Sequence, residues 1–497
     1  MKTLKAILAG ALVLALAACQ IPFSGTGSLK IQLPGGARAA AGSTGDLVRL
    51  QLTRNGVVIP LSGGDYIEKV LAGQTVSLDG LSPGPGYNIL VSTGLRNAGE
   101  TFYRTKLFQK SEPFEISAGT DTSVNLTLSA SRFTVLESVA GSAHGATTDS
   151  NGSILIYLNG AGTVQVSNGG VSTNIPVSNW SNLGSATVNG LGYNNAFLPA
   201  TLWINTTKGI FESTPPSSTI GSMPMSDSNN ATITPVVTES GSVILHDSAT
   251  TQDNKIAYYA GSGMTAGIRV NTDPKWQTLT DLLSLDSMSS LKDTLSKSGQ
   301  VIRGFASASP FAYLSTAIGT YRIPAELIAG TTQGLGNSLK DGKDANGVSI
   351  IVEPDDGSLI IGPVSVFSDG ASKAVAFGGT VKGLFASAVD PLKGIPQTPS
   401  GHLGLVAGTP GLNISQVATS AVKAADGTVY TAAYSANTRE LLLLKDLAVV
   451  DHISAFEGLP SGSLKFTWYV TTVSSVHTLH LVASGGDATV QLEVATW

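Results

Sequence analysis

The chain has 497 residues and a formal net charge of −5. A mildly acidic chain lacks the clustered Lys and Arg side chains that nucleic acid requires, so no nucleic-acid partner is expected. Hydrophobic residues make up 42% of the sequence, which supplies a core and excludes a disordered stalk. The length predicts two or more domains. Because the chain has 1 cysteine, it has no internal disulfide.

The first residues have the features of an export signal. Lys2 and Lys5 precede an apolar stretch of about ten residues, half of what a membrane-spanning helix needs. The stretch ends in Leu16–Cys19 (LAAC), which resembles the lipobox of bacterial lipoproteins. That resemblance implies cleavage before Cys19, lipidation of Cys19 and anchoring through several acyl chains. Gln20, where an inner-membrane retention signal would place Asp, favours the outer membrane, on its periplasmic or its surface face.

The sequence then divides near residue 130. Residues 1–18 are the expected signal peptide, residues 19–27 a lipidated tether, and residues 28–130 a first domain. This domain contains short alternating segments such as Val48–Thr53, and a hairpin signal at Asn55-Gly56. About seven short strands in about 100 residues are typical of a β-sandwich. Its segment 78–91, LDGLSPGPGYNILV, resembles a signature of immunoglobulin-like or transthyretin-like modules, which implies that Tyr87 ties down a corner between a loop and a strand.

Residues 131–497 consist of longer units, in which a polar turn such as Asp426-Gly427 separates two apolar strands. These units resemble the inner strands of β-propeller blades, which implies an all-β fold with an irregular propeller of about six or seven blades. The turns do not recur at one period and no Trp-Asp or Gly-His signature repeats, so WD40 and kelch repeats are excluded. A second array of β-sandwiches or a β-solenoid is the alternative fold. Apolar residues at helical spacing over 276–297 predict a helical insertion.

Catalytic motifs are scarce, and no catalytic residue is predicted. Residues 80–84 (GLSPG) match the G-x-S-x-G nucleophile elbow of α/β-hydrolases. Prolines and a strand follow where that motif needs a helix, so we expect a turn. His477 and His480 lie three apart in an expected strand, so they should face opposite sides and not share a metal.

Two ligand signals are present. Asp344, Asn346 and Glu353 match the third, fifth and twelfth positions of an EF-hand loop, so they are candidate calcium ligands. Gly342 occupies the first position and the following segment is strand-like, so a polar turn is favoured, and no other cofactor is expected. Trp180, flanked by polar residues, is a candidate for stacking on a sugar ring, with packing between blades as the alternative.

These features predict a lipid-anchored cell-envelope protein that acts as a non-enzymatic binding, adhesion or scaffold module for a protein or carbohydrate ligand. The alternative is an extracytoplasmic polysaccharide hydrolase or lyase, since propellers host such enzymes. Carboxylates or histidines that converge on the central channel would indicate catalysis. A channel lined by Ser, Thr and Ala would favour binding.

Overall fold

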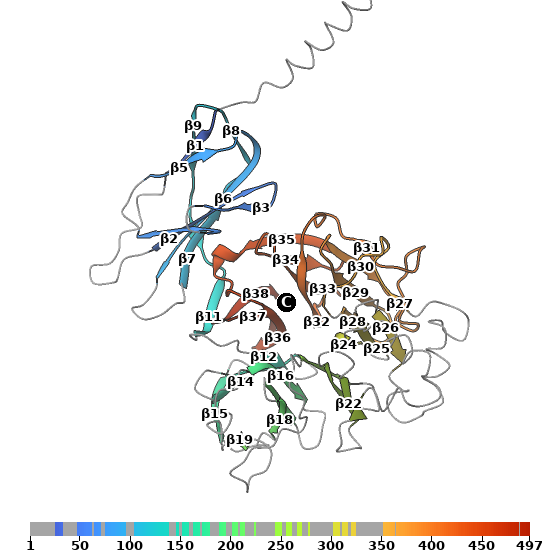
Figure 1. Cartoon of the computed structure of the whole chain (residues 1–497). Helices are drawn as coiled ribbons and strands as arrows, with labels where there is room; N and C mark the ends of the chain where they lie inside the picture. The colour runs from blue at the N-terminus through green and yellow to red at the C-terminus, as the bar shows by residue number, and fades with distance from the viewer. Residues whose placement is uncertain are drawn as a thin grey trace, which may run out of the picture. The chain divides into compact units, whose positions relative to one another are not determined.

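The computed structural model describes residues 25–32, 47–61, 64–70, 75–95, 104–138, residues 152–153 and strands within 146–324, and residues 351–362, 364–486 and 488–497 (Figure 1). The chain divides into two compact units, of which the first ends at Ser131 and the second comprises Arg132–Trp497. The described part is all-β apart from the short 3-10 helix η4 (Ala455–Glu457). None of the described segments forms an apolar helix of membrane-spanning length. The expected signal peptide, Cys19 and most of the tether lie outside the described residues.

The first unit is a β-sandwich. One sheet has the order β5-β1-β9, and the other has the order β10-β7-β6-β2-β3, with β4 on β2 and β8 on β6. Leu29 and Ile31 of the first sheet share a buried core with Leu50, Leu52 and Ile89 of the second. The strands are β1 (Gly27–Gln32), β2 (Leu47–Arg54), β3 (Val57–Ile59), β4 (Ile67–Val70), β5 (Val76–Leu81), β6 (Gly84–Leu95), β7 (Arg104–Lys110), β8 (Phe114–Ile116), β9 (Asp121–Asn125) and β10 (Ser129–Ala130).

Two turns of this unit follow from local sequence. Asn55 and Gly56 have φ of 52° and 80°, so the predicted hairpin turn between β2 and β3 is confirmed. The GLSPG run joins β5 directly to β6, so it is a turn between strands and not a nucleophile elbow. The Tyr87 hydroxyl donates a 2.5 Å hydrogen bond to the carbonyl oxygen of Ser82. The predicted role of Tyr87 at the corner is therefore confirmed.

The second unit consists, in its described part, of seven sheets, which we call blades 1 to 7. Blades 1 to 3 contain β12 (Ala146–Thr148), β13 (Ile154–Leu158), β14 (Thr163–Asn168), β15 (Val171–Ser178) and β19 (Met223–Pro224); β16 (Val188–Asn194), β17 (Thr201–Thr206) and β18 (Gly209–Ser213); and β20 (Ile244–Thr250), β21 (Lys255–Ala260), β22 (Ala266–Val270) and β23 (Gln277–Thr278).

Blades 4 to 6 contain β24 (Ile302–Ala308), β25 (Phe311–Thr316), β26 (Thr320–Pro324) and β27 (Ile351–Val352); β28 (Ser365–Ser368), β29 (Ala374–Gly379), β30 (Leu384–Ala388) and β31 (Gly404–Leu405); and β32 (Ile414–Lys423), β33 (Val429–Ser435), β34 (Glu440–Lys445) and β35 (Ala448–Ser454). Blade 7 contains β36 (Lys465–Val473), β37 (Val476–Ser484) and β38 (Ala488–Thr496), and β11 (Phe133–Ser138) completes it.

The blades form a closed ring. The first strand of each blade contacts the first strand of the next, in the order β12, β16, β20, β24, β28, β32, β36, and β36 contacts β12. A ring of radially repeated sheets around a centre is a β-propeller, which confirms the predicted fold (Figure 1). Blade 7 joins the two ends of the unit, because β11 pairs antiparallel with β38.

Part of the predicted helical insertion at 276–297 is wrong. Gln277–Thr278 is strand β23 and pairs with Gly267 and Ile268 of β22. The remainder of that insertion lies outside the described residues.

Between blades 6 and 7 the core is apolar and includes Trp468, which is 5% exposed and donates its indole N–H to Ala418 O at 2.9 Å.

Candidate functional site

The strands nearest the centre of the ring carry few side chains suited to catalysis. In the seven described first strands, Asp247 is the one carboxylate and His246 the one histidine, and the cations are Arg303, Lys423 and Lys465. General acid–base chemistry on a polysaccharide uses a pair of carboxylates. The described inner strands do not provide such a pair.

Hydroxyl groups on these strands connect neighbouring blades instead. Ser365 Oγ of β28 donates to Thr419 Oγ1 of β32 at 2.9 Å and accepts the Thr419 N–H at 2.8 Å. Thr467 Oγ1 of β36 donates to Ala146 O of β12 at 2.9 Å, across the closure of the ring. These short side chains fix blade 5 to blade 6 and blade 7 to blade 1.

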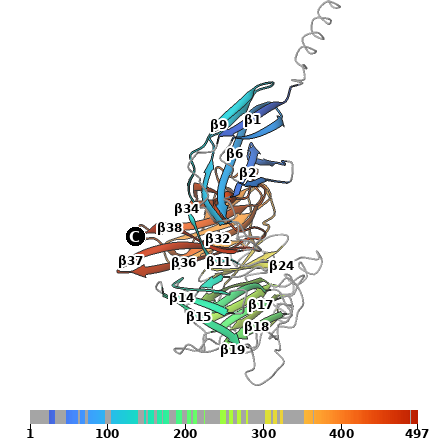
Figure 2. The same cartoon turned by 90° about the vertical axis from the view of Figure 1, so that its left-hand side faces the viewer.

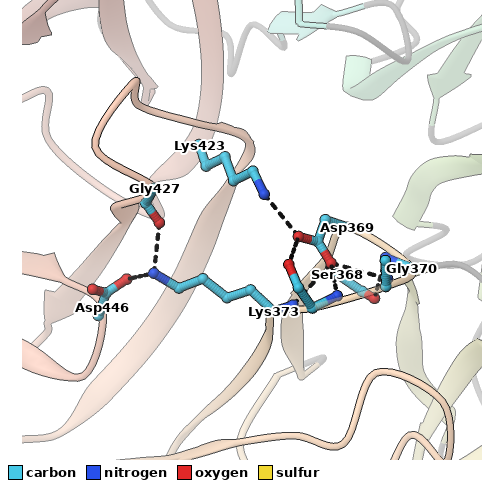
Figure 3. Close-up of polar contacts among 9 residues, drawn as sticks. Ser368, Asp369, Gly370, Lys373, Lys423, Gly427 and Asp446 are labelled. Atoms are coloured by element: carbon cyan, nitrogen blue, oxygen red, sulfur yellow. Dashed lines mark hydrogen bonds and ion pairs between the residues drawn. The ribbon is translucent and has the colours of Figure 1, made fainter.

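A polar cluster joins the turns of blades 5 and 6 (Figure 3). The Asp369 carboxylate, in the β28–β29 turn, accepts the backbone N–H groups of residues 371–373 at 2.8–3.0 Å, and Lys423 Nζ at 2.7 Å. The N–H of Lys373, together with the Lys423 ammonium, holds the pKa of Asp369 far below its usual range. Asp369 is therefore a permanent anion whose oxygens are engaged within the protein, and it does not suit the role of a general base.

Lys373 makes the second half of this cluster. Its Nζ donates to Gly427 O at 2.6 Å and pairs with Asp446 Oδ1 at 2.6 Å (Figure 3). Lys423 of β32, in blade 6, thus contacts the β28–β29 turn of blade 5, and Lys373 of that turn contacts blade 6. We call this set, Asp369, Lys373, Lys423 and Asp446, the inter-blade latch. It fixes the turns at one end of blades 5 and 6.

Apolar side chains are exposed on other turns that lie at the same end of the blades as the latch. Up-and-down strand order places the turns after first and third strands at one end of each blade. Leu447 in the β34–β35 turn is 37% exposed, and Val473 and Val476, which flank the β36–β37 turn, are 60% and 48% exposed. Figure 2 shows β36 and β37 reaching the margin of the second unit. We call the turns 369–373, 424–428, 446–447 and 473–476 the turn surface.

The tip of the β36–β37 hairpin is strained. Ser474 and Ser475 have φ of 49° and 67°, in the left-handed region that favours Asn and Gly. Residues held in such conformations cluster at functional sites. The strain therefore singles out the tip between Val473 and Val476 as a candidate contact point.

The histidines of blade 7 have separate partners. His480 is 4% exposed, contacts Thr471 Oγ1 at 2.8 Å and Gln491 Nε2 at 2.9 Å, and stacks on Tyr469. Burial lowers the pKa of His480, so its ring is neutral. His477 stacks instead on the ring of Trp497. Among the described residues no three His, Cys, Asp or Glu side chains gather to hold a metal ion.

The residues predicted as sites are not brought together by the described part of the structure. Glu353 follows β27, with its Oε1 3.8 Å from His402 Nδ1. Asp344, Asn346 and Trp180 lie outside the described residues. The calcium site and the sugar contact therefore remain predictions, and strand β27 occupies the segment where an EF-hand would need a helix.

A buried ion pair at the ring closure was not predicted from the sequence. Arg132, next to β11, donates hydrogen bonds of 2.7 and 2.9 Å to the Glu457 carboxylate and also pairs with Asp451 of β35. Glu457 is 2% exposed, and burial raises its pKa despite the guanidinium. The two partners lie 325 residues apart, and no local pattern marks either of them.

Comparisons with known proteins give no family. No protein-family model matches the sequence, and no curated protein matches it. Among solved structures, Raptor of Chaetomium thermophilum is 10% identical with a TM-score of 0.43, and the match covers 73% of this chain and 29% of that one. The Cps50 (Swd1) β-propeller domain of Myceliophteria thermophila is 12% identical with a TM-score of 0.41, covering 73% and 100%. U3-55K is 9% identical with a TM-score of 0.41, covering 73% and 98%. The ring assignment rests on the strand contacts of this chain.

Proposed function

We propose that this protein is a lipid-anchored, non-enzymatic binding or scaffold module of the bacterial cell envelope. The observation that carries the proposal is the turn surface, in which the inter-blade latch fixes the turn that exposes Leu447 and the β36–β37 turn exposes Val473 and Val476. The scarcity of carboxylates on the described inner strands supports binding over polysaccharide hydrolysis.

The latch makes the turn surface suitable for recognition. Each apolar side chain that becomes fully buried on binding contributes about 1.5–3 kcal/mol. Ordering flexible loops offsets such gains, whereas turns already fixed by Lys373 and Lys423 lose little freedom on binding. Apolar side chains on turns that also carry the charges of the latch match the usual interface plan of an apolar centre with a polar rim.

The anchor is proposed from the sequence alone. Two or more acyl chains on Cys19 would hold the protein stably on a membrane, because each buried CH₂ adds about 0.8 kcal/mol. Gln20 supports the outer membrane as its location. In this proposal lipidated Cys19 holds the protein on the membrane, and the turn surface contacts a partner.

The turn surface is tested by cross-linking in intact envelopes followed by purification of the protein. We expect one stoichiometric partner protein with the wild type, and its loss with Val473→Asp/Val476→Asp. Val381→Asp is the matched control, because Val381 is 62% exposed in the β29–β30 turn, outside the turn surface. Equal recovery of the partner with both variants would contradict the proposal, as would release of sugar fragments from envelope polysaccharide by the purified protein.

The anchor is tested separately. Cys19→Ser should move the protein from the membrane fraction to the soluble fraction without changing its urea unfolding midpoint. If the variant stayed in the membrane fraction, lipidation at Cys19 would be wrong, whatever the outcome at the turn surface.

A further inference from the structure

The first unit contains a cavity that the proposed function does not use. Its volume is about 570 Å³, within the range of about 300–1,000 Å³ typical of ligand sites. One wall is the connection from β7 to β8, residues 109–114, and the other is strand β9 with the residues that lead to β10. The cavity therefore runs beside an edge strand of the β5-β1-β9 sheet.

Strand β9 exposes its main chain on the side of this cavity. β9 pairs with β1 in parallel, and Ser28 N–H donates to Thr120 O, so alternate residues of β9 direct their main-chain groups toward β1. Val124 is one of the residues whose main-chain N–H and C=O groups face β1. The N–H and C=O groups of Ser123 and Asn125 point away from β1, and within the described residues no strand pairs with them.

The two edge strands of this sheet differ in how well they are protected against pairing with a further strand. At the other edge the β1–β5 pairing shifts register between Gly27 and Leu29, an irregularity of the kind that discourages strand addition. The β1–β9 pairing runs without a shift, and β9 (DTSVN) contains no proline and no lysine. Apart from Asp121 at its start, which pairs with Lys30, its edge is regular and uncharged.

The side chains around this edge indicate what kind of strand would fit. Phe114 and Val124 line the cavity and pack against the core of the sandwich, so they offer apolar contacts. Lys110 and Glu112 also line it, and their opposite charges cancel. An extended segment without net charge, with apolar side chains on one face, matches this lining.

We propose that the β9 edge and its cavity bind an extended polypeptide segment of a partner protein, which adds to the β5-β1-β9 sheet as a fourth strand. The main-chain groups of Ser123 and Asn125 hydrogen-bond to the added strand. Its alternate apolar side chains contact Phe114 and Val124. This site lies in the first unit and does not depend on the turn surface.

The test uses the mature full-length protein and a phage-displayed library of random heptapeptides. We expect enrichment of uncharged peptides with alternating apolar residues, and slower hydrogen exchange of β9 when an enriched peptide is bound. Asn125→Pro removes the outward N–H at an edge position that tolerates proline, and should weaken binding about tenfold. Asn125→Ala keeps the N–H and should bind within about twofold of the wild type.

A chemical control keeps the test independent of protein folding. The enriched peptide is N-methylated on its odd residues in one form and on its even residues in another, and one form should lose binding to the wild type, because alternate N–H groups face β9. Unchanged binding of both forms would overturn the proposal. Failure to enrich any peptide, binding of a neutral oligosaccharide in place of peptides, or a dimer in light scattering that Asn125→Pro dissolves would also overturn it.

Discussion

Removal of the Arg132 guanidinium should leave the buried Glu457 carboxylate without its cation. Glu457 is 2% exposed and receives two hydrogen bonds from Arg132, of 2.7 and 2.9 Å. Breaking one side of a buried ion pair costs about 3–5 kcal/mol. The Arg132 side chain is 36% exposed, so water replaces part of its contribution. We therefore expect Arg132→Ala to lower the free energy of unfolding by about 3 kcal/mol at pH 7.

The pH dependence of this loss has a defined sign. Burial raises the pKa of Glu457 above 4.5 in the folded state, despite the partner. A raised carboxyl pKa means that the folded state holds the proton more tightly, so ionisation lowers stability as pH rises above 4.5. Without Arg132 this pKa rises further, because its favourable partner is gone. The loss of stability should therefore be larger at pH 8 than at pH 5.

Urea unfolding followed by the fluorescence of buried Trp468 measures these effects. In Arg132→Ala/Glu457→Gln the buried charge is absent, so the variant should recover part of the lost stability. Lys382→Ala removes an exposed ion pair with Asp356 and should leave the midpoint unchanged. Equal losses for Arg132→Ala at pH 5 and pH 8, with no recovery in the double variant, would refute the reasoning.

Three further changes test local features. Ser474→Asn with Ser475→Gly should raise stability by about 1 kcal/mol, seen as a higher urea midpoint at unchanged slope, because both residues have positive φ. Tyr87→Phe should destabilise the first unit by about 1 kcal/mol, measured by hydrogen exchange of β6, through loss of the corner hydrogen bond; unchanged exchange would contradict that role. Asp369→Asn should cost about 1–2 kcal/mol at pH 7 in urea unfolding. Since the pKa of Asp369 is lowered, this difference should shrink as pH falls below 3.8, and a constant difference would be contrary to expectation.

Local features of the first unit could be predicted from the sequence because their causes are local. The Asn55-Gly56 turn follows from the φ values that these residues tolerate. The corner at Tyr87 needs a partner only five residues away, at Ser82. In the same way, alternation along Val48–Thr53 was sufficient to predict β2.

The arrangement of the second unit depends on contacts that no local pattern contains. Its blades contain three to five strands in the described part, so the sequence period is irregular. Apolar spacing predicted a helix at 276–297, but pairing with β22 holds Gln277–Thr278 as a strand, because tertiary pairing overrides local propensity. Lys373 and Asp446 illustrate the same limit for side chains, since each lies in an ordinary turn and their pairing arises only from the ring.

The closing strand of the ring yields the strictest test of the second unit. β11 begins at Phe133, three residues beyond Ala130, and it is the outer strand of blade 7. Phe133 is 8% exposed and packs in the core that blades 6 and 7 share. A fragment that begins at residue 139 would lack this strand, expose the edge of β38 and lack Arg132, the cation that pairs with Glu457.

Loss of a buried phenylalanine alone costs about 3–5 kcal/mol, which is a large share of the stability of a typical domain. We therefore expect fragment 132–497 to unfold cooperatively in urea, and fragment 139–497 to unfold at a much lower midpoint or to aggregate. Equal midpoints for the two fragments would mean that β11 does not close the ring. A lower midpoint for 139–497 that Glu457→Gln partly restores would assign that part of the loss to the missing Arg132 cation and the rest to the missing strand.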